Sequence, residues 1–407
     1  MSLWQDYMKI KQLPSDFVVR EVSGIKPGRM GIYAVYELAK FDIGTIEAMD
    51  IIGKFWALSR KAISAGGLKD RHAQTAQLIS IYRGPDKDMT QDRFQLKYLG
   101  RVEHAIGPDS FDANHFDITI RDLSKPEMDR ITQRLDEVRR DGLPNYFDEQ
   151  RFGSVRAGND FAAKQLIRRD YEGALKTALT STSAADRKQV RDVRTAISQN
   201  WGKWAELMGL LPRSPERSIV NYLRDHKPVN FRRAFELIDP KLVLLYLHAY
   251  QSYLWNKGLS QYLTRNIQNG ANSNSEFIRF PYMLGEFVFY RQLPTEALES
   301  LQGLSIPFVT HRTVYNDSTI RQIFEGILKE EGIRMEDFKI RGMVKTYFRK
   351  GERNAIIFTD KLSVTAAESD ELNKGKQKMT VSFEIPRGAY ATILVKRLTY
   401  DFSLKAI

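Results

Sequence analysis

The spacing of apolar residues changes twice along the chain. Residues 17–123 and 354–398 are dominated by short runs in which apolar and polar residues alternate, as in strands. Residues 157–262 instead carry apolar residues at helical spacing almost throughout. Strand-rich ends around a helical middle predict an α+β fold with a mixed or antiparallel sheet, in which one β-rich domain is interrupted by an inserted helical domain.

Individual elements can be placed in the two strand-rich parts. A helix is expected from Thr45, a candidate N-cap, and a second helix at 126–142, which begins with Pro and ends in Gly. The region holding 277–283 and 286–293 has a more irregular pattern. The predicted strands are 17–22, 32–38, 75–82, 94–100, 116–123, 354–362, 378–386 and 388–398.

Composition narrows the class of protein. The net charge of +12 over 407 residues fits a polyanionic partner such as nucleic acid, and fits an unspecialised basic surface equally well. The chain has no cysteine, which excludes disulfides, thiolate nucleophiles and sulfur-ligated metals. The N-terminus lacks a signal-peptide core, and the most apolar helical stretch, 242–254, is too short to span a bilayer. We therefore expect a soluble, cytoplasmic protein without membrane contact.

Signatures of cofactor and metal chemistry are missing. The sequence holds no Walker A loop, GxGxxG, HExxH or GxSxG. Its six histidines show no ligand spacing, and the Asp-Lys-Asp run at 86–88 lies in a hydrophilic stretch that favours a solvated loop over a magnesium site. We expect no metal and no cofactor, so any catalysis must come from side chains.

The segment GGLKDRHAQTAQ at 66–77 offers such a side chain. Asp70 lies between Lys69 and Arg71, and two adjacent cations would keep its carboxylate ionised and able to act as a nucleophile or base. Gly66 and Gly67 permit a close approach of backbone to a ligand. A solvated charge cluster at a turn remains the alternative interpretation of these residues.

Two further segments mix aromatic and polar side chains. Residues 143–153 combine an amide, aromatics and an arginine, the groups that read base edges, stack on bases and hold phosphates. Residues 339–353 carry six Lys or Arg against one Glu, with Tyr347 and Phe348 among them. Both suit an RNA-contacting surface. An ordinary turn and a solvated basic face, respectively, stay open as alternatives.

Five separated segments, in order, resemble the TruD family of tRNA pseudouridine synthases. They are FVVRE at 17–21, GLKDRHAQTAQ at 67–77, NYFDEQRFG at 145–153, HAYQSYLWN at 248–256 and IPRGAYATILVKRL at 385–398, the last taken as a closing strand. The resemblance spans nearly the whole chain. It implies isomerisation of uridine to pseudouridine in folded tRNA, without cofactor or metal, with position 13 of the D arm as the usual target.

The resemblance also implies roles for single residues. Asp70 would be the catalytic aspartate, Lys69 would orient it and keep it ionised, and Asn145 would position the target. Phe17 and Phe147 would stack on the flipped-out base and its surroundings, and Glu21 would orient Lys69 or nearby backbone. The remaining residues expected to contact RNA are Arg71, Tyr146, Gln150, Arg151, Lys345, Arg349 and Lys350.

The resemblance further implies a domain arrangement. The catalytic domain would comprise 1–153 and 345–407, and the inserted TRUD domain would comprise 154–344, the two forming a V shape with a basic cleft. The chain length is closer to the longer archaeal and eukaryotic type, whose members accept further RNAs. We expect a monomer whose partner is tRNA.

Three positions depart from the family pattern. Asp148 stands where Gly is usual, in a place that Asp could fill even at positive φ. Gly44–Thr45 replaces a common Asn–Thr, and Lys396–Arg397–Leu398 lacks the usual Glu. Two other functions stay open: a catalytically silent RNA-binding protein or tRNA chaperone on the same scaffold, which would not need Asp70, and a metal-dependent nuclease, for which the sequence offers only 86–88.

Overall fold

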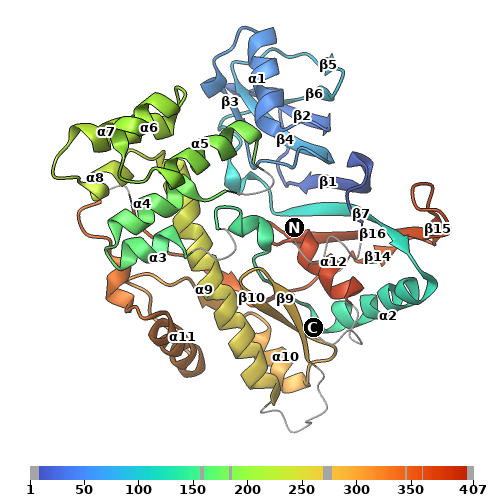
Figure 1. Ribbon diagram of the computed structural model, residues 1–407. Helices are drawn as coiled ribbons and strands as arrows, with labels where there is room; N and C mark the ends of the chain where they lie inside the picture. The colour runs from blue at the N-terminus through green and yellow to red at the C-terminus, as the bar shows by residue number, and fades with distance from the viewer. Residues whose placement is uncertain are drawn as a thin grey trace. The chain divides into compact units, whose positions relative to one another are not determined.

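The computed structural model describes residues 9–155, 160–182, 186–268, 277–343, 346–359 and 361–400. They fall into two compact units (Figure 1). Unit 1 comprises the described residues up to 144 together with those from 357 onwards, and unit 2 comprises those of 145–356. The chain therefore leaves one unit, builds the other and returns, as the alternating periodicities predict.

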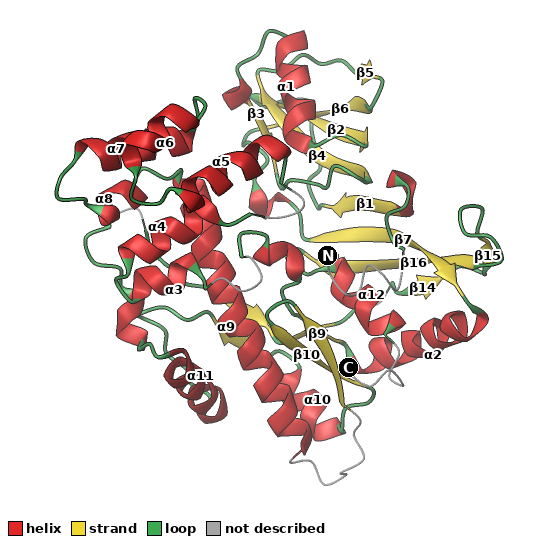
Figure 2. Ribbon diagram, viewed as in Figure 1, coloured by secondary structure: helices red, strands yellow, loops and turns green. Residues whose placement is uncertain are grey.

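Unit 1 is built on one sheet. Among the described residues ten strands join it, in the order β14-β16-β7-β1-β4-β2-β6-β5, with β15 paired to β16 and β3 to β4 (Figure 2). The β1–β4 pair is parallel and its neighbours are antiparallel. The strands are β1 (Phe17–Val22), β2 (Tyr33–Phe41), β3 (Ile63–Ala65), β4 (Gln74–Tyr82), β5 (Met89–Gln91), β6 (Phe94–Val102), β7 (Ala113–Leu123), β14 (Ser363–Val364), β15 (Glu368–Ser369) and β16 (Gln377–Pro386).

Helix α1 (Thr45–Phe55) covers the face formed by β2, β4 and β6 (Figure 1). Alternate residues of β2 point into this core, where they meet Met49 and Ile52 of the helix. The N-cap is Gly44, so the prediction of Thr45 as cap was wrong by one residue. Thr45 is the first helical residue, and its hydroxyl contacts another loop, described below.

The segment 388–398, predicted as a strand, instead forms helix α12 (Ala391–Thr399). Every residue from Ile393 to Thr399 is buried, so the apolar run carries no period that separates a helix from a strand. Gly388, at φ +83°, makes the turn that precedes the helix. Arg397 pairs with Glu137 of helix α2 (Lys125–Asp141) at 2.7 Å, which packs the two helices together.

Unit 2 is largely helical, which confirms the prediction for its middle part. Its centre is the long helix α9 (Pro240–Gln268), against which α3 and α11 pack. The region predicted as irregular contains a hairpin of β9 (Phe277–Tyr282) and β10 (Gly285–Tyr290). The other elements are α3 (Ala162–Ile167), α4 (Tyr171–Thr180), α5 (Lys188–Gln199), α6 (Trp204–Leu210), α7 (Pro215–Asp225), α8 (Phe231–Phe235), α10 (Thr295–Leu301), α11 (Ser318–Glu331), β11 (Ser305–Pro307) and β12 (Glu352–Asn354).

The unit boundaries lie close to two short strands, β8 (Leu143–Pro144) and β13 (Ile356–Ile357). The predicted boundaries, after residues 153 and 344, would place 145–153 and 346–356 in the first domain, whereas both segments pack in unit 2. The reason is backbone pairing between them, since the Asn145 amide donates to the Ala355 carbonyl at 2.9 Å. Among the described residues, no helix has the length and apolar composition needed to cross a bilayer.

Candidate active site

Asp70 lies in the loop between β3 and β4, and its side chain is 45% exposed. Its carboxylate accepts a hydrogen bond from the Lys11 ammonium group at 2.6 Å. The same ammonium lies 3.8 Å from the centre of the Phe17 ring, whose own side chain is buried. The structure therefore brings Phe17 and Asp70 to one cation, Lys11, that the sequence interpretation did not include.

Lys69 points away from solvent. Its Nζ is 3.0 Å from Glu21 Oε1 and 2.6 Å from Asn114 Oδ1, and the two charged side chains are only 10% and 2% exposed. The other Glu21 oxygen accepts from the Leu78 amide at 3.1 Å. Glu21 thus contacts both Lys69 and neighbouring backbone. The Lys69 ammonium group is directed at Glu21 and Asn114, and Lys69 supports the loop through that buried pair.

Uncharged side chains fix the backbone of the same loop. The Thr45 hydroxyl accepts from the Lys69 amide at 3.0 Å. The Gln77 amide group donates to the Gly67 carbonyl at 2.8 Å, and its oxygen lies 2.9 Å from the Thr45 hydroxyl. Since Thr45 begins α1 and Gln77 belongs to β4, the loop is held to both elements.

Lys40 provides a further contact beneath Asp70. Its side chain is buried, and its ammonium group donates to the backbone carbonyl of Asp70 at 2.7 Å. Burial lowers the pKa of Lys40 to about 8; the Asp70 charge opposes this shift, and the Lys69 charge adds to it. Lys40 is therefore a buried lysine that still carries its proton at neutral pH.

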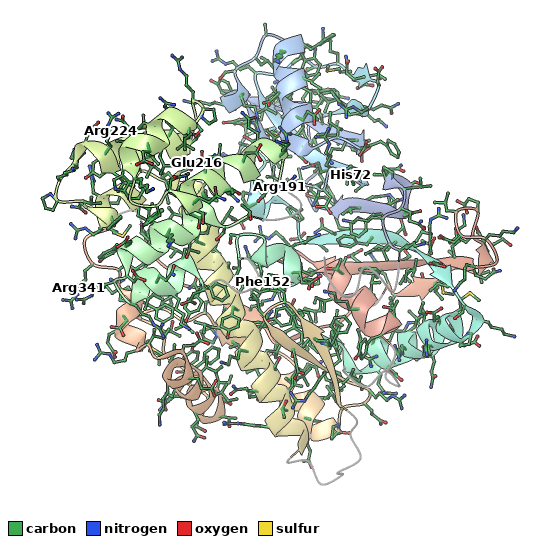
Figure 3. All side chains as sticks on the ribbon, in the orientation of Figure 1. His72, Phe152, Arg191, Glu216, Arg224 and Arg341 are labelled. Atoms are coloured by element: carbon green, nitrogen blue, oxygen red, sulfur yellow. The ribbon has the colours of Figure 1, made fainter. Side chains whose placement is uncertain are left out.

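Arg71 and His72 continue the loop on the exposed side. Arg71 lies 3.3 Å from Glu47 of α1, and His72 lies 2.8 Å from Asp42 (Figure 3, where His72 is labelled). Both side chains are more than half exposed. Arg71 is thus placed at the surface next to Asp70, where its cation is accessible.

The segment 145–153 lies in unit 2 and is mostly buried. The Tyr146 hydroxyl, fully buried, lies 3.0 Å from the Ser260 hydroxyl and 3.2 Å from the Val288 carbonyl. The Phe147 backbone is held at both its amide and its carbonyl by the side chain of Asn256, at 2.9 and 2.8 Å. These two aromatic residues therefore pack into the interior of unit 2.

The faces of the Phe147 ring have neighbours within unit 2. The Arg353 guanidinium lies 4.2 Å from the ring centre, and the Trp255 ring meets it edge-on at 5.7 Å. Arg353 also donates to the side-chain oxygen of Asn145, whose amide group donates to the Asn354 carbonyl at 3.0 Å. Asn145 is thereby held against β12.

The polar residues of unit 2 that were predicted to contact RNA differ in their exposure and in their neighbours. Arg151 lies 5.0 Å from the Phe147 ring, while Gln150, Arg349 and Lys350 are exposed. Burial lowers the pKa of His248 to about 4, with Arg151 and Arg349 acting in the same direction, so these cations gather around one site on α9. Lys345 lies outside the described residues. Asp148 has φ −88°, so this position does not require a positive φ.

The structure thus groups the predicted site residues by unit. Asp70, Lys69, Glu21, Phe17 and Arg71 lie in unit 1, and Asn145, Tyr146, Phe147, Gln150, Arg151, Arg349 and Lys350 lie in unit 2. The run at 86–88 is engaged locally, because Asp86 pairs with Arg101 and Asp88 accepts from the Tyr98 amide at 2.7 Å. Within the described part of the chain, no three His, Asp or Glu residues are arranged to hold a metal ion.

Sequence reasoning missed four residues that support Asp70: Lys11, Lys40, Asn114 and Thr45, the last of which was assigned only a capping role. Lys40 carried a usable signal, since it occupies an inward position of the alternating strand 33–41. Lys11 and Asn114 carried none, because their contacts join residues far apart in sequence.

The chain resembles known proteins over most of its length. The family model described as "tRNA pseudouridine synthase D (TruD)" matches residues 6–398. The chain belongs to the TruD family. Its class of enzyme is therefore that of the pseudouridine synthases, which are isomerases, and its fold is theirs.

Individual relatives match over almost their full length. A protein of Methanococcus maripaludis named "Probable tRNA pseudouridine synthase D 1" is 33% identical, over 96% of this chain and 99% of its own. The tRNA pseudouridine synthase D of Aquifex aeolicus is 29% identical, over 96% and 98%. A crystal structure of a TruD protein from Methanosarcina mazei superposes with a TM-score of 0.73 at 25% identity, covering 96% of this chain and 93% of that one.

Proposed function

We propose that this chain isomerises uridine to pseudouridine in folded tRNA, at position 13 of the D arm, with Asp70 as the catalytic carboxylate. In this reaction the N1–C1′ bond breaks, the uracil turns, and a C5–C1′ bond forms. The proton on C5 is lost and N1 gains one, so no oxidant, reductant or energy source is required.

The observation that carries the proposal is the setting of Asp70. Its carboxylate is exposed, while two buried side chains hold the backbone: Lys40 donates to the Asp70 carbonyl, and Thr45 accepts from the Lys69 amide. Its ion-pair partner Lys11 is itself partly exposed, so a substrate can replace or join this contact. A carboxylate that acts as a nucleophile or as a proton acceptor must be accessible and must be held in place by its surroundings.

Three routes are open to this carboxylate. It can attack the ribose at C1′, attack the uracil ring, or remove the ribose 2′ proton on a path through a glycal. The neighbouring Lys11 would stay near the carboxylate in each, since its ammonium also rests on the Phe17 ring.

The tRNA substrate is supported by charge and by relatedness. The net charge of +12 favours binding to a polyanion, and the relatives described above are named tRNA pseudouridine synthases. With such a substrate we expect the chain to act in the cytoplasm, and we expect it to be a monomer.

The proposal is tested with tRNA transcripts that carry uridine or cytidine at position 13. After incubation with the enzyme in EDTA, carbodiimide treatment and primer extension locate any pseudouridine. We expect one stop, caused by position 13, in the uridine transcript alone. Stops at other positions would support the reaction but contradict position 13 as its target. The absence of a stop in every tRNA that the protein binds would favour a silent RNA-binding protein.

A further inference from the structure

Lys40 occupies a place where its neighbours are apolar. It follows Ala34, Tyr36 and Leu38 in the inward-facing row of β2, the row that packs against α1. Lys40 is only 2% exposed. Burying an ammonium group is costly unless it is hydrogen-bonded. The contacts of the Lys40 ammonium group must therefore offset the cost of its burial.

The contacts of the ammonium group indicate the role of Lys40. Nζ donates to the carbonyl of Asp70 at 2.7 Å and to the carbonyl of Ile43 at 2.8 Å. Ile43 lies in the connection between β2 and α1, and Asp70 lies in the loop between β3 and β4. One charged group thus joins the backbone beneath the exposed carboxylate to the strand and to the start of the helix.

The elements around Lys40 add few charges. Its cross-strand neighbours are Thr75 of β4 and Phe94 of β6, which are buried and uncharged. The charged groups that act on it, Asp70 and Lys69, both come from the loop that it holds. The ammonium is therefore committed to the loop rather than to an ion-pair network elsewhere.

We propose that Lys40 is a positioning residue for the isomerisation: it fixes the backbone of Asp70, so that the carboxylate keeps its place when the substrate disturbs the Lys11 ion pair. This inference rests on the proposed role of Asp70. Lys11 and Lys40 then have different roles. Lys11 contacts the reacting oxygen and can move with the substrate, while Lys40 holds the main chain behind it.

The test compares Lys40→Met and Lys40→Gln with the control Lys97→Met, a lysine that lies exposed on β6. Three quantities are measured: the single-turnover rate of pseudouridine formation, the Kd for tRNA, and hydrogen exchange of the amides of 66–73. For Lys40→Met we expect a rate about 10- to 100-fold lower, as for other misplaced reacting groups, with Kd unchanged within about threefold and faster exchange in the loop. Lys97→Met should match wild type in all three.

The pH dependence of the rate shows whether the charge of Lys40 matters, or only the space that its side chain fills. Because the pKa of Lys40 lies near 8, the wild-type rate should decline as pH rises above about 8 and the ammonium loses its charge. Lys40→Gln keeps a donor without a titrating group, so it should recover part of the rate lost in Lys40→Met and should lack this decline.

Two results would overturn the inference. One is a folded Lys40→Met with wild-type rate and wild-type exchange. The other is a variant that loses tRNA binding in step with its rate, which would make Lys40 a general structural residue. If wild type itself makes no pseudouridine, the proposed function fails, and loop exchange alone then decides whether Lys40 holds the Asp70 backbone.

Discussion

The loop 66–73 in unit 1 and the segment 145–153 in unit 2 carry the two most specific family patterns, yet they are built in opposite ways. The loop is held by polar contacts and leaves Asp70 exposed. The segment buries Tyr146 and Phe147 among aromatic rings and holds their backbone from α9. A family pattern can therefore mark an accessible carboxylate or a packed scaffold, and only the structure distinguishes the two.

The largest effect is expected at Phe147. Its ring is 3% exposed, so Phe147→Ala should lower the free energy of unfolding by about 3–5 kcal/mol, as other buried phenylalanines do. Phe147→Leu should cost less than Phe147→Ala, because it removes fewer buried atoms. Urea denaturation followed by far-UV circular dichroism measures both.

The same pair of variants tests the base-stacking role proposed for Phe147. If the ring stacks on the target base, Phe147→Leu should be slow in turnover even where it is folded, because base–aromatic stacking is worth about 1–3 kcal/mol. A stable Phe147→Leu with normal kinetics would leave Phe147 as scaffold alone.

An effect of similar size is expected at the buried ion pair between Glu21 and Lys69, which supports the loop. Glu21→Gln removes one partner and leaves the Lys69 charge buried, so we expect a loss of about 3–5 kcal/mol in unfolding free energy. Glu37→Gln, at an exposed position of β2, is the matched control. A Glu21→Gln variant as stable as this control would show that Asn114 alone suffices to hold Lys69.

A smaller, pH-dependent effect follows from Lys40. Its pKa is lowered from 10.5 to about 8, so between these two values the unfolded chain binds more protons than the folded chain. Stability of the wild type therefore gains from Lys40 as pH rises through this window. As pH rises from about 8 to 10.5, the unfolding free energy of wild type should increase relative to that of Lys40→Met. Below pH 8 the difference between the two proteins should stay constant. A difference that does not vary with pH would contradict the lowered pKa.

The smallest effect is expected at the exposed cations of unit 2. If Arg349 and Lys350 bind phosphates, Arg349→Gln/Lys350→Gln should reduce the slope of log Kd against log salt by about 0.7–0.9 for each phosphate that the variant no longer neutralises. Arg334→Gln is the control, since Arg334 already pairs with Asp337 at 3.3 Å. An unchanged slope in the double variant would remove these residues from the RNA-contacting surface.

Much of the fold followed from the sequence because its strands are half-buried. Alternation identified β1, β2, β4, β6 and β7, and helical spacing identified the interior of unit 2. Helix α12 was missed because burial on all sides erases the period. The compact units divide the chain at other residues than the predicted domains, because pairing between Asn145 and Ala355 joins segments that are distant in sequence.

The site divides in the same way. Asp70 was singled out as a candidate because glycines and cations surround it in sequence and because its segment resembles the family pattern. Its support was not found, because Lys11, Lys40 and Asn114 reach the loop only through the register of the sheet and the packing of α1. A buried lysine at an inward strand position is the one signal that could have drawn attention to Lys40.

The most direct test of the central claim, that Asp70 catalyses the isomerisation, is tritium release from tRNA carrying 5-tritiated uridine. Wild type and Asp70→Asn are compared in EDTA, with the Kd for tRNA measured in parallel. We predict release by wild type alone, with affinities that agree within a few-fold, because Asp70→Asn removes the charge and preserves the shape. Equal release by the two proteins would contradict a catalytic role for Asp70.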